Sequence, residues 1–227
     1  MALAILNRGT DGGTASSTTI TPTSNFGSSS LAVLIVLVSN NVTLTNNPTD
    51  SNGNEWVRYY SKSDFDVTYP SAEAVFVSKQ LSTLTTSDTV SFSIGSSQNY
   101  SAFLYELTTS SSKRPAFIKA FSSNGTSSDL IIIPSSEGII TGDGIIAWVS
   151  DNTSVAYTGD VDTTDGSWSA IQTEDNPNFS SVIQSKIITG TSTQTFSPSV
   201  GTWNYVGYCA FREHSLPDEN LSGFFGL

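Results

Sequence analysis

The chain has no stretch of ten or more residues in which apolar side chains recur with the period of a helix. Its apolar runs are short, rich in β-branched residues and bounded by Gly, Asn, Asp, Ser or Pro, which is typical of strands. Val90, Phe92 and Ile94 alternate with serines and therefore share one face of a strand. Leu31–Val38 is apolar on both faces, which predicts a central strand with both faces buried. The expected fold is all-β.

The expected strands are Ala2–Asn7, Ser17–Thr21, Leu31–Ser39, Val42–Thr45, Trp56–Tyr60, Ala74–Lys79, Thr89–Ile94, Ser101–Leu107, Ala116–Ser122, Ile131–Pro134, Gly144–Val149, Val155–Gly159, Ser181–Ile188, Gln194–Phe196 and Tyr205–Arg212. Turns are expected at Asp11-Gly12-Gly13, Asn52-Gly53-Asn54 and Asp165-Gly166, because these residues tolerate positive φ. No linker rich in proline or charge divides the chain. We therefore expect one domain over residues 1–212 and a C-terminal tail over residues 213–227.

The order of the expected strands repeats weakly. Leu31–Ser39 and Gly144–Ser150 are each followed by a polar segment that leads to a tryptophan, and each half of the chain ends in an aromatic strand. This order predicts two pseudo-equivalent halves packed face to face.

Charge and cysteine content exclude several classes of protein. The net charge is −11, and the nine Lys and Arg residues form no basic stripe that could neutralise phosphates, so we expect no nucleic-acid partner. Cys209 and His214 are the only residues of their types, which excludes a disulfide framework and a zinc site built from several Cys or His of one chain. The longest apolar run has eight residues, Leu31–Val38, so no membrane span is expected. Residues 1–8 lack the basic start of a secretory signal peptide.

Several segments share a recognisable pattern. They are the buried strand Ala32–Ser39, the Asp-x-x-Gly-Asn-x-Trp turn from Asp50 to Trp56, the strands around Val75–Val77, Thr89–Ile94 and Ser101–Leu107, the segment from Gly142 to Val149, and the closing strand Tyr205–Arg212. Over residues 28–212 this pattern resembles the jelly-roll-like β-sandwich domains that are common in phage structural proteins and in bacterial surface proteins. The resemblance implies a single-domain, jelly-roll-like antiparallel β-sandwich. It implies no catalytic residues, because the family has none in common.

Two loops have oxygen-bearing side chains in spacings that calcium sites use. Asp50, Asn52 and Asn54 alternate along one loop, but the glycine and glutamate of an EF-hand are absent, and a β-turn capped by Asp50, with Trp56 entering the core, is the favoured interpretation. The second loop gathers three acids, Asp160, Asp162 and Asp165. A calcium site there and a solvated acidic loop both stay open, and the solvated loop is favoured.

The sequence also contains candidate binding and catalytic residues. The tryptophans could stack on sugars, yet a sandwich of this size needs aromatic core, so Trp148 and Trp203 are expected inside. Trp168 sits in a polar loop and is a candidate contact residue. Carboxylate pairs as in glycosidases could form among Glu73, Glu106, Asp64 and Asp66, but no local motif selects a pair. We therefore expect no enzyme and no cofactor, with calcium as the one open alternative.

The apolar end of the tail, with Phe224, Phe225 and Leu227, follows a polar hinge and is expected to dock on its own subunit or on a neighbour. Together with the resemblance, these features favour a non-enzymatic virion structural protein of a phage, most concretely a capsid decoration or cement subunit, made in the host cytoplasm and located in the virion. Its partners would be capsid or other virion proteins and further copies of itself, for example in a trimer. The alternative is a carbohydrate- or receptor-binding module of a tail appendage.

Overall fold

A computed structural model describes residues 3–28, 30–40, 42, 44, 46–63, 71–79, 82–110, 113–124, 131–133, 138–176, 178–198 and 205–215. The strands in these residues are β1 (Ala4–Ile20), β2 (Leu31–Val38), β3 (Thr49–Asp50), β4 (Glu55–Ser63), β5 (Ala72–Lys79), β6 (Val90–Thr108), β7 (Lys113–Asn124), β8 (Ile131–Ile133), β9 (Gly144–Asp151), β10 (Gln172–Asn176), β11 (Phe179–Ile187), β12 (Gln194–Phe196) and β13 (Tyr205–Ser215). The described part of the chain contains no helix, and hence none that could cross a membrane.

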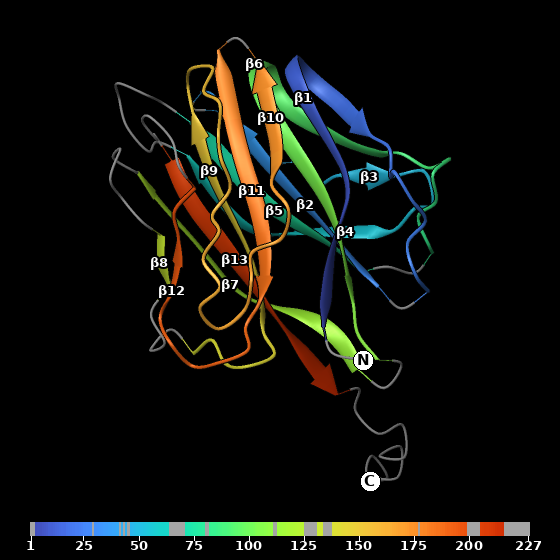
Figure 1. The fold of residues 1–227 in the computed structure, drawn as a ribbon. Coiled ribbons are helices and arrows are strands. Elements are labelled where there is room, and N and C mark those ends of the chain that lie inside the picture. The colour runs from blue at the N-terminus through green and yellow to red at the C-terminus, as the bar shows by residue number, and fades with distance from the viewer. Residues whose placement is uncertain are drawn as a thin grey trace, which may run out of the picture.

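The strands form two antiparallel sheets that pack face to face as a β-sandwich (Figure 1). Sheet A has the strand order β1-β6-β2-β5-β4, with β3 paired to β6, and sheet B has the order β10-β11-β9-β13-β7. The short strands β8 and β12 form a separate two-stranded antiparallel sheet beside sheet B. The fold is all-β and compatible with the expected jelly-roll-like arrangement.

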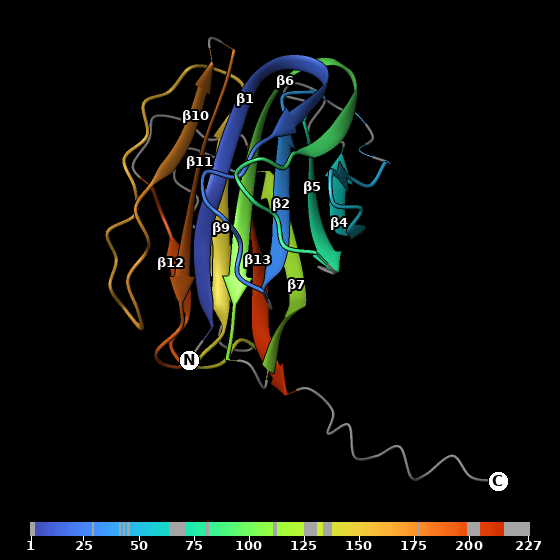
Figure 2. The same cartoon turned by 90° about the vertical axis from the view of Figure 1, so that its right-hand side faces the viewer.

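The two halves of the chain have the same strand order. Residues 4–108 supply sheet A and residues 113–215 supply sheet B, and sheet B read from its other end is β7-β13-β9-β11-β10. Thus β1, β6, β2, β5 and β4 correspond in position to β7, β13, β9, β11 and β10. In Figure 2 the corresponding edge strands β10 and β4 therefore lie at opposite margins of the molecule. The weak repeat expected from the sequence is confirmed as a repeat of topology.

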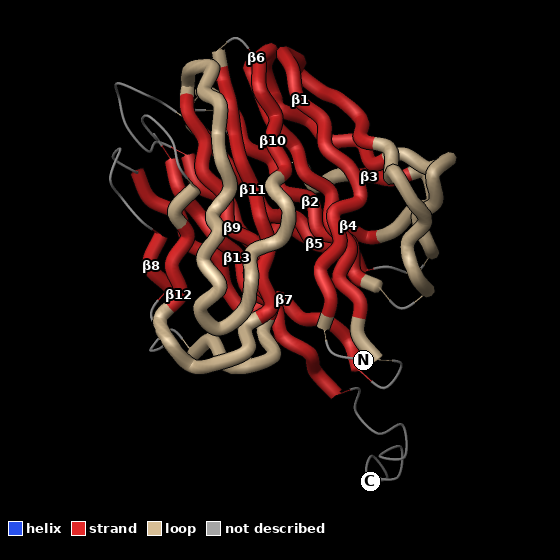
Figure 3. The backbone as a smooth tube through the Cα atoms, viewed as in Figure 1, coloured by secondary structure: helices blue, strands red, loops and turns tan. Residues whose placement is uncertain are grey.

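The hydrophobic core has three layers, because both faces of each sheet are covered. Alternate residues of β2, β5 and β6 meet those of β9, β11 and β13 between the sheets, around Trp148. On the outer face of sheet A, Phe26, Leu44 and Leu84 from connecting segments pack over β2 and β6. On the outer face of sheet B, the segment 152–171 runs across the strands (Figure 3) and contributes Trp168 to the third layer. Trp148 is buried as expected, and so are Leu34, Val36, Phe92, Leu104 and Tyr208 in the three layers.

Several expectations about strands and turns were wrong, among them a strand at Val42–Thr45, where the described residues 42 and 44 are in no strand. Asp11-Gly12-Gly13 is no turn but lies inside β1, which pairs with β6 from Ala4 to Ile20 with register shifts at Asn7/Gly9 and Ala15/Ser17. The expected strands Thr89–Ile94 and Ser101–Leu107 are one strand, β6, because the long partner β1 supplies ladder bonds on both sides of Gly95. Residues 155–159 form only an isolated bridge, since the segment covers a sheet face instead of joining an edge.

Candidate functional site

Buried charged groups fix the covering segments to the sheets. On the outer face of sheet A, Glu106 accepts hydrogen bonds from Arg8 Nε at 2.6 Å and from the Gly27 N–H at 2.5 Å. The Arg8 guanidinium also lies 5.9 Å from the centroid of the Phe26 ring. A buried carboxylate requires such donors, and charge-assisted hydrogen bonds are the strong ones. Glu106, with its hydrogen bonds from Arg8 and Gly27, therefore holds the segment 21–28 on sheet A.

A second bidentate pair fixes the turn before β9. Arg212 Nε and Nη2 each donate to a carboxylate oxygen of Asp143 at 2.7 Å, and the hydrogen bonds raise the pKa of Arg212. The Ile140 N–H donates to the same carboxylate, and Arg212 also reaches the Gly138 carbonyl. Three hydrogen bonds from Arg212 thus tie the turn to β13, and the bond from Ile140 to Asp143 closes the turn itself.

The loop with the three predicted calcium ligands wraps around a lysine. Lys186 of β11 is buried, and its Nζ donates to the Thr164 carbonyl at 2.6 Å and lies 3.4 Å from Asp162 Oδ2. The ammonium group also stands 5.3 Å from the centroid of the Trp168 ring, a cation–π arrangement. The loop thus already surrounds a positive charge, the ammonium group of Lys186.

The three acids have separate partners. Asp160 accepts hydrogen bonds from the backbone of Asp162 and of Ser197, while Asp165 Oδ2 accepts one from the Ser192 N–H at 2.6 Å. Asp162 Oδ1 accepts hydrogen bonds from the N–H and hydroxyl of Thr164, and these, with Lys186, lower its pKa. Among the described residues, no group of three His, Cys, Asp or Glu side chains is placed to hold a metal ion. Asp165-Gly166 does form the expected turn, with φ of 53° and 116°.

We expect millimolar calcium to leave the thermal midpoint unchanged, because the carboxylates of this loop already accept hydrogen bonds from the chain. A melting curve recorded in calcium, in magnesium and in chelator tests this. A midpoint that rises with calcium alone, as mass action requires of a specific ligand, would establish a calcium site and contradict the expectation.

The other candidate calcium loop is the capped turn that the sequence favoured. Asp50 Oδ1 accepts hydrogen bonds from the N–H groups of Asn52 and Asn54, at 2.9 and 3.0 Å, and Gly53 has a φ of 72°. Asp50 Oδ2 accepts a hydrogen bond from Nε1 of the buried Trp56 at 2.8 Å. The prediction of a turn capped by Asp50, with Trp56 in the core, is confirmed.

A polar cluster that sequence reasoning missed lies between the sheets. Glu73 of β5 is buried on the inner face of sheet A, and its Oε2 accepts a hydrogen bond from Trp148 Nε1 at 2.8 Å. From β7, Ser122 Oγ is 2.6 Å from the Tyr60 hydroxyl, and the Ser122 carbonyl accepts a hydrogen bond from Lys62 Nζ at 2.8 Å. Burial raises the pKa of Glu73 to about 7, although Ser122, Trp148 and Lys62 act in the opposite direction.

Part of this cluster has no protein partner. The Ser122 side chain lies close enough to Glu73 to lower its pKa. Glu73 Oε1 nevertheless has no hydrogen-bond partner among the described residues. Leu37 of β2 lies between Glu73 and Ser101 in one cross-strand row. Ser101 Oγ also has no hydrogen-bond partner among the described residues. Buried polar atoms of this kind are usually satisfied by ordered water. The one sequence signal was a glutamate inside the apolar strand Ala72–Lys79.

The structure does not bring the candidate catalytic carboxylates together. Glu73 is opposite Leu37 and faces the inside of the sandwich, whereas Glu106 is opposite Ala32 and faces the outer side of sheet A. Asp64 and Asp66 lie outside the described residues. His214 is exposed near the end of β13, with Arg114 as its cross-strand neighbour.

The tryptophans that the structure describes lie inside the protein. Trp56 and Trp148 are buried as core residues, and Trp168 is only 8% exposed, with its ring 4.7 Å from that of Phe196. The Trp168 ring, which also contacts the Lys186 ammonium group, is therefore not presented to a partner on the described surface. Trp203 and the tail residues Phe224, Phe225 and Leu227 lie outside the described residues.

Two kinds of open groove remain on the surface. One of about 490 Å³ is lined by Phe92 and by hydroxyl and amide side chains of β1, β3, β6 and the segment before β3: Ser17, Thr18, Thr19, Asn46, Asn47, Thr49, Ser91 and Ser93. Two smaller grooves, of about 350 and 250 Å³, adjoin each other along the start of β1, because both are lined by Ile5, Ser169 and Ser185.

Comparisons of the chain with protein-family models, with curated proteins and with solved structures gave no match.

Proposed function

We propose that this chain is a non-enzymatic structural subunit of a phage virion, most concretely a capsid decoration or cement protein. One observation carries the proposal: the buried charged groups described above all hold covering segments or sheets together. Arg8 with Glu106, Arg212 with Asp143 and Lys186 with Asp162 each fix a loop. A surface whose loops are held in this way loses little conformational entropy when it binds a partner, which suits a protein that works by static attachment.

The sequence resemblance to phage jelly-roll-like domains supports the virion setting, and the two-sheet sandwich is compatible with it. The partners would be capsid or other virion proteins together with further copies of the chain. Assembly in the host cytoplasm needs neither a membrane nor a nucleic-acid contact, and the net charge of −11 is consistent with that.

Virions that lack the protein test this function. We expect negative-stain images of such particles to lose regular knobs from the capsid while the tail keeps its appendages, and the purified protein added back should restore the knobs. Loss of tail appendages with an unchanged capsid would contradict the decoration proposal and favour the adhesion alternative.

A carbohydrate- or receptor-binding module of a tail appendage is the second candidate, and the 490 Å³ groove favours it. Hydroxyl and amide groups without charge, as in Thr18, Asn46 and Ser93, are the groups that hydrogen-bond neutral sugars. Phe92 lines the groove but is buried, so no aromatic ring face is offered for stacking there. A glycan array with the purified protein separates the two candidates, since only the second requires a saccharide ligand.

The tail gives a further prediction. Deleting Leu221–Leu227 should leave the sandwich folded, because the described strands end by Ser215 and the described core layers are built from residues 3–211. It should weaken attachment to capsids by about tenfold or more through the loss of one of several contacts. Binding of the truncated and full-length chains to bare capsids measures this, with circular dichroism as the control for folding. Unchanged affinity would show that the tail has no assembly role, and a chain that no longer folds would assign the tail to the core of its own subunit.

A further inference from the structure

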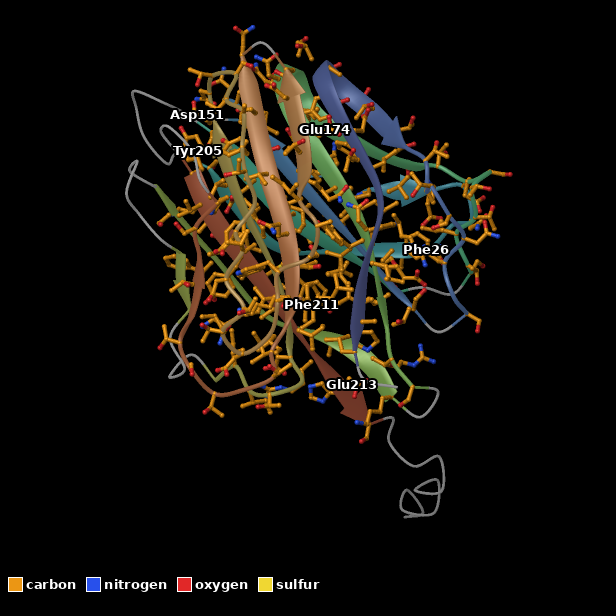
Figure 4. All side chains as sticks on the ribbon, viewed as in Figure 1. Phe26, Asp151, Glu174, Tyr205, Phe211 and Glu213 are labelled. Carbon is orange, nitrogen blue, oxygen red and sulfur yellow. The ribbon has the colours of Figure 1, made fainter. Side chains whose placement is uncertain are left out.

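The repeat of topology gives the sandwich two equivalent edges with different chemistry. At one edge β1 lies beside β10, and at the corresponding edge β4 lies beside β7. We call β1 with β10 the acidic rim and β4 with β7 the aromatic rim. Figure 4 shows Glu174 on β10 at the acidic rim, next to β1. Because the strands correspond in position, any difference between the rims reflects their side chains.

The aromatic rim exposes large apolar side chains. Tyr59 of β4 is 49% exposed and Phe121 of β7 is 50% exposed, and both belong to the small set of large hydrophobic residues that the described surface exposes. The Tyr59 ring is 4.8 Å from that of Phe117, so β4 and β7 are in aromatic contact at this edge, while the Phe121 ring packs against Tyr208 on the outer face of sheet B. Exposed aromatic groups held by their neighbours are the side chains that dominate binding energy at protein interfaces.

Backbone pairing with another strand is disfavoured at this rim. The register of β4 shifts between Arg58 and Tyr60, which leaves Tyr59 without a cross-strand partner, and the register of β7 shifts so that Ile118 is left over. Bulges of this kind blunt an edge strand and redirect a side chain. A partner would therefore contact the aromatic rim through side chains.

The charges of the two rims are opposite. The strands of the aromatic rim contain five of the nine Lys and Arg residues of the chain and a single acid, Glu55: the cations are Arg58, Lys62, Lys113, Arg114 and Lys119. The strands of the acidic rim contain Asp11, Glu174 and Asp175 against one cation, Arg8, which is paired with the buried Glu106. Lys113 is paired with Glu213 of β13, and Lys62 donates to the Ser122 carbonyl next to the buried Glu73. The strands of the aromatic rim still contain more cations than acids in a chain with a net charge of −11.

We infer that the aromatic rim binds the acidic rim of a second copy of this chain, so that subunits associate head to tail. Opposite charge favours this contact, whereas two aromatic rims would place cations against cations. A head-to-tail contact closes into a ring when the rotation between subunits allows it and otherwise continues as a filament. The inference deepens the proposed function by naming how decoration subunits would associate. Its test uses purified protein without virions, so failure of either proposal is recognised separately.

Single substitutions provide the first test, with mass measured by light scattering after size exclusion. We expect the wild type to form a species larger than a monomer, and Phe121→Ser at the aromatic rim to weaken association by about tenfold or more. Asp175→Lys at the exposed acidic rim should weaken it as well. The matched control is Val161→Ser, which removes a side chain that is 89% exposed but belongs to neither rim, and should leave the mass unchanged. Melting curves check that all variants are folded.

A mixture of the two rim variants provides the decisive test. Phe121→Ser keeps an intact acidic rim and Asp175→Lys keeps an intact aromatic rim, so the two variants together retain one working interface. We expect each alone to be monomeric and the mixture to form a pair of one copy of each. A wild type that stays monomeric at high micromolar concentration would overturn the inference. So would an Asp175→Lys chain that still associates with itself, which indicates a symmetric dimer, or a mixture that does not associate.

Discussion

Replacing Trp148 by alanine is expected to lower the free energy of unfolding by about 3–5 kcal/mol, as for other large-to-small changes of a core aromatic residue. The indole is fully buried between the sheets and donates its N–H to Glu73. Gly207 stands directly opposite on β13, and a Cβ there would lie 2.6 Å from the indole ring. The glycine at position 207 leaves room for the indole. A smaller side chain at position 148 therefore leaves a cavity that the flanking strands cannot close.

Urea denaturation of the purified protein measures this effect. Val161→Ala is the control, because its side chain is almost wholly exposed and such substitutions change stability by less than about 0.5 kcal/mol. Gly207→Ala should also destabilise, by about 1–3 kcal/mol, since the added methyl group overpacks the same site. A Trp148→Ala variant that loses less than about 1 kcal/mol would show that the indole is not a central element of the core.

The layered fold could be predicted from local patterns because burial determines them. Leu31–Val38 is apolar on both faces because the strand lies in the middle of sheet A, with one core layer on each side. The corresponding strand β9 is buried along its whole length for the same reason. Sheet membership was predictable too, since each half of the chain closes its own sheet and the strand order repeats.

Features that depend on contacts between distant segments could not be predicted. Asp11-Gly12-Gly13 has the composition of a turn, but a Cβ at Gly12 would lie 2.7 Å from the Glu174 side chain. The glycine therefore allows β10 to approach β1, a reason that no local pattern contains. The acids at positions 160, 162 and 165 invite a metal interpretation in the same way, because the buried Lys186 that pairs with Asp162 comes from a strand more than twenty residues later.

The buried carboxyl of Glu73 predicts an unusual dependence of stability on pH. Burial raises its pKa from 4.5 to about 7 in the folded chain. Below about pH 4.5 the group is protonated in both states, so the free energy of unfolding does not depend on pH through this group. Between about pH 4.5 and 7 only the unfolded chain ionises, and the free energy of unfolding should fall by up to about 1.4 kcal/mol per pH unit, about 3 kcal/mol in all. Stability contributed by the neutral group is thus lost as the pH rises.

Glu73→Gln isolates this contribution, because the amide oxygen can still accept the hydrogen bond from Trp148 Nε1 but carries no charge. We expect the variant and the wild type to be similarly stable near pH 4.5, and the variant to be more stable by about 3 kcal/mol at pH 8, in urea denaturation series across this range. Trp148→Phe is the companion variant. It removes a donor that lowers the pKa of Glu73, so its stability should go on falling to higher pH than in the wild type. Parallel pH profiles of the wild type and Glu73→Gln would contradict this prediction. They would mean that the Glu73 carboxyl ionises as readily in the folded chain as in the unfolded chain, although burial on the inner face of β5 should prevent this.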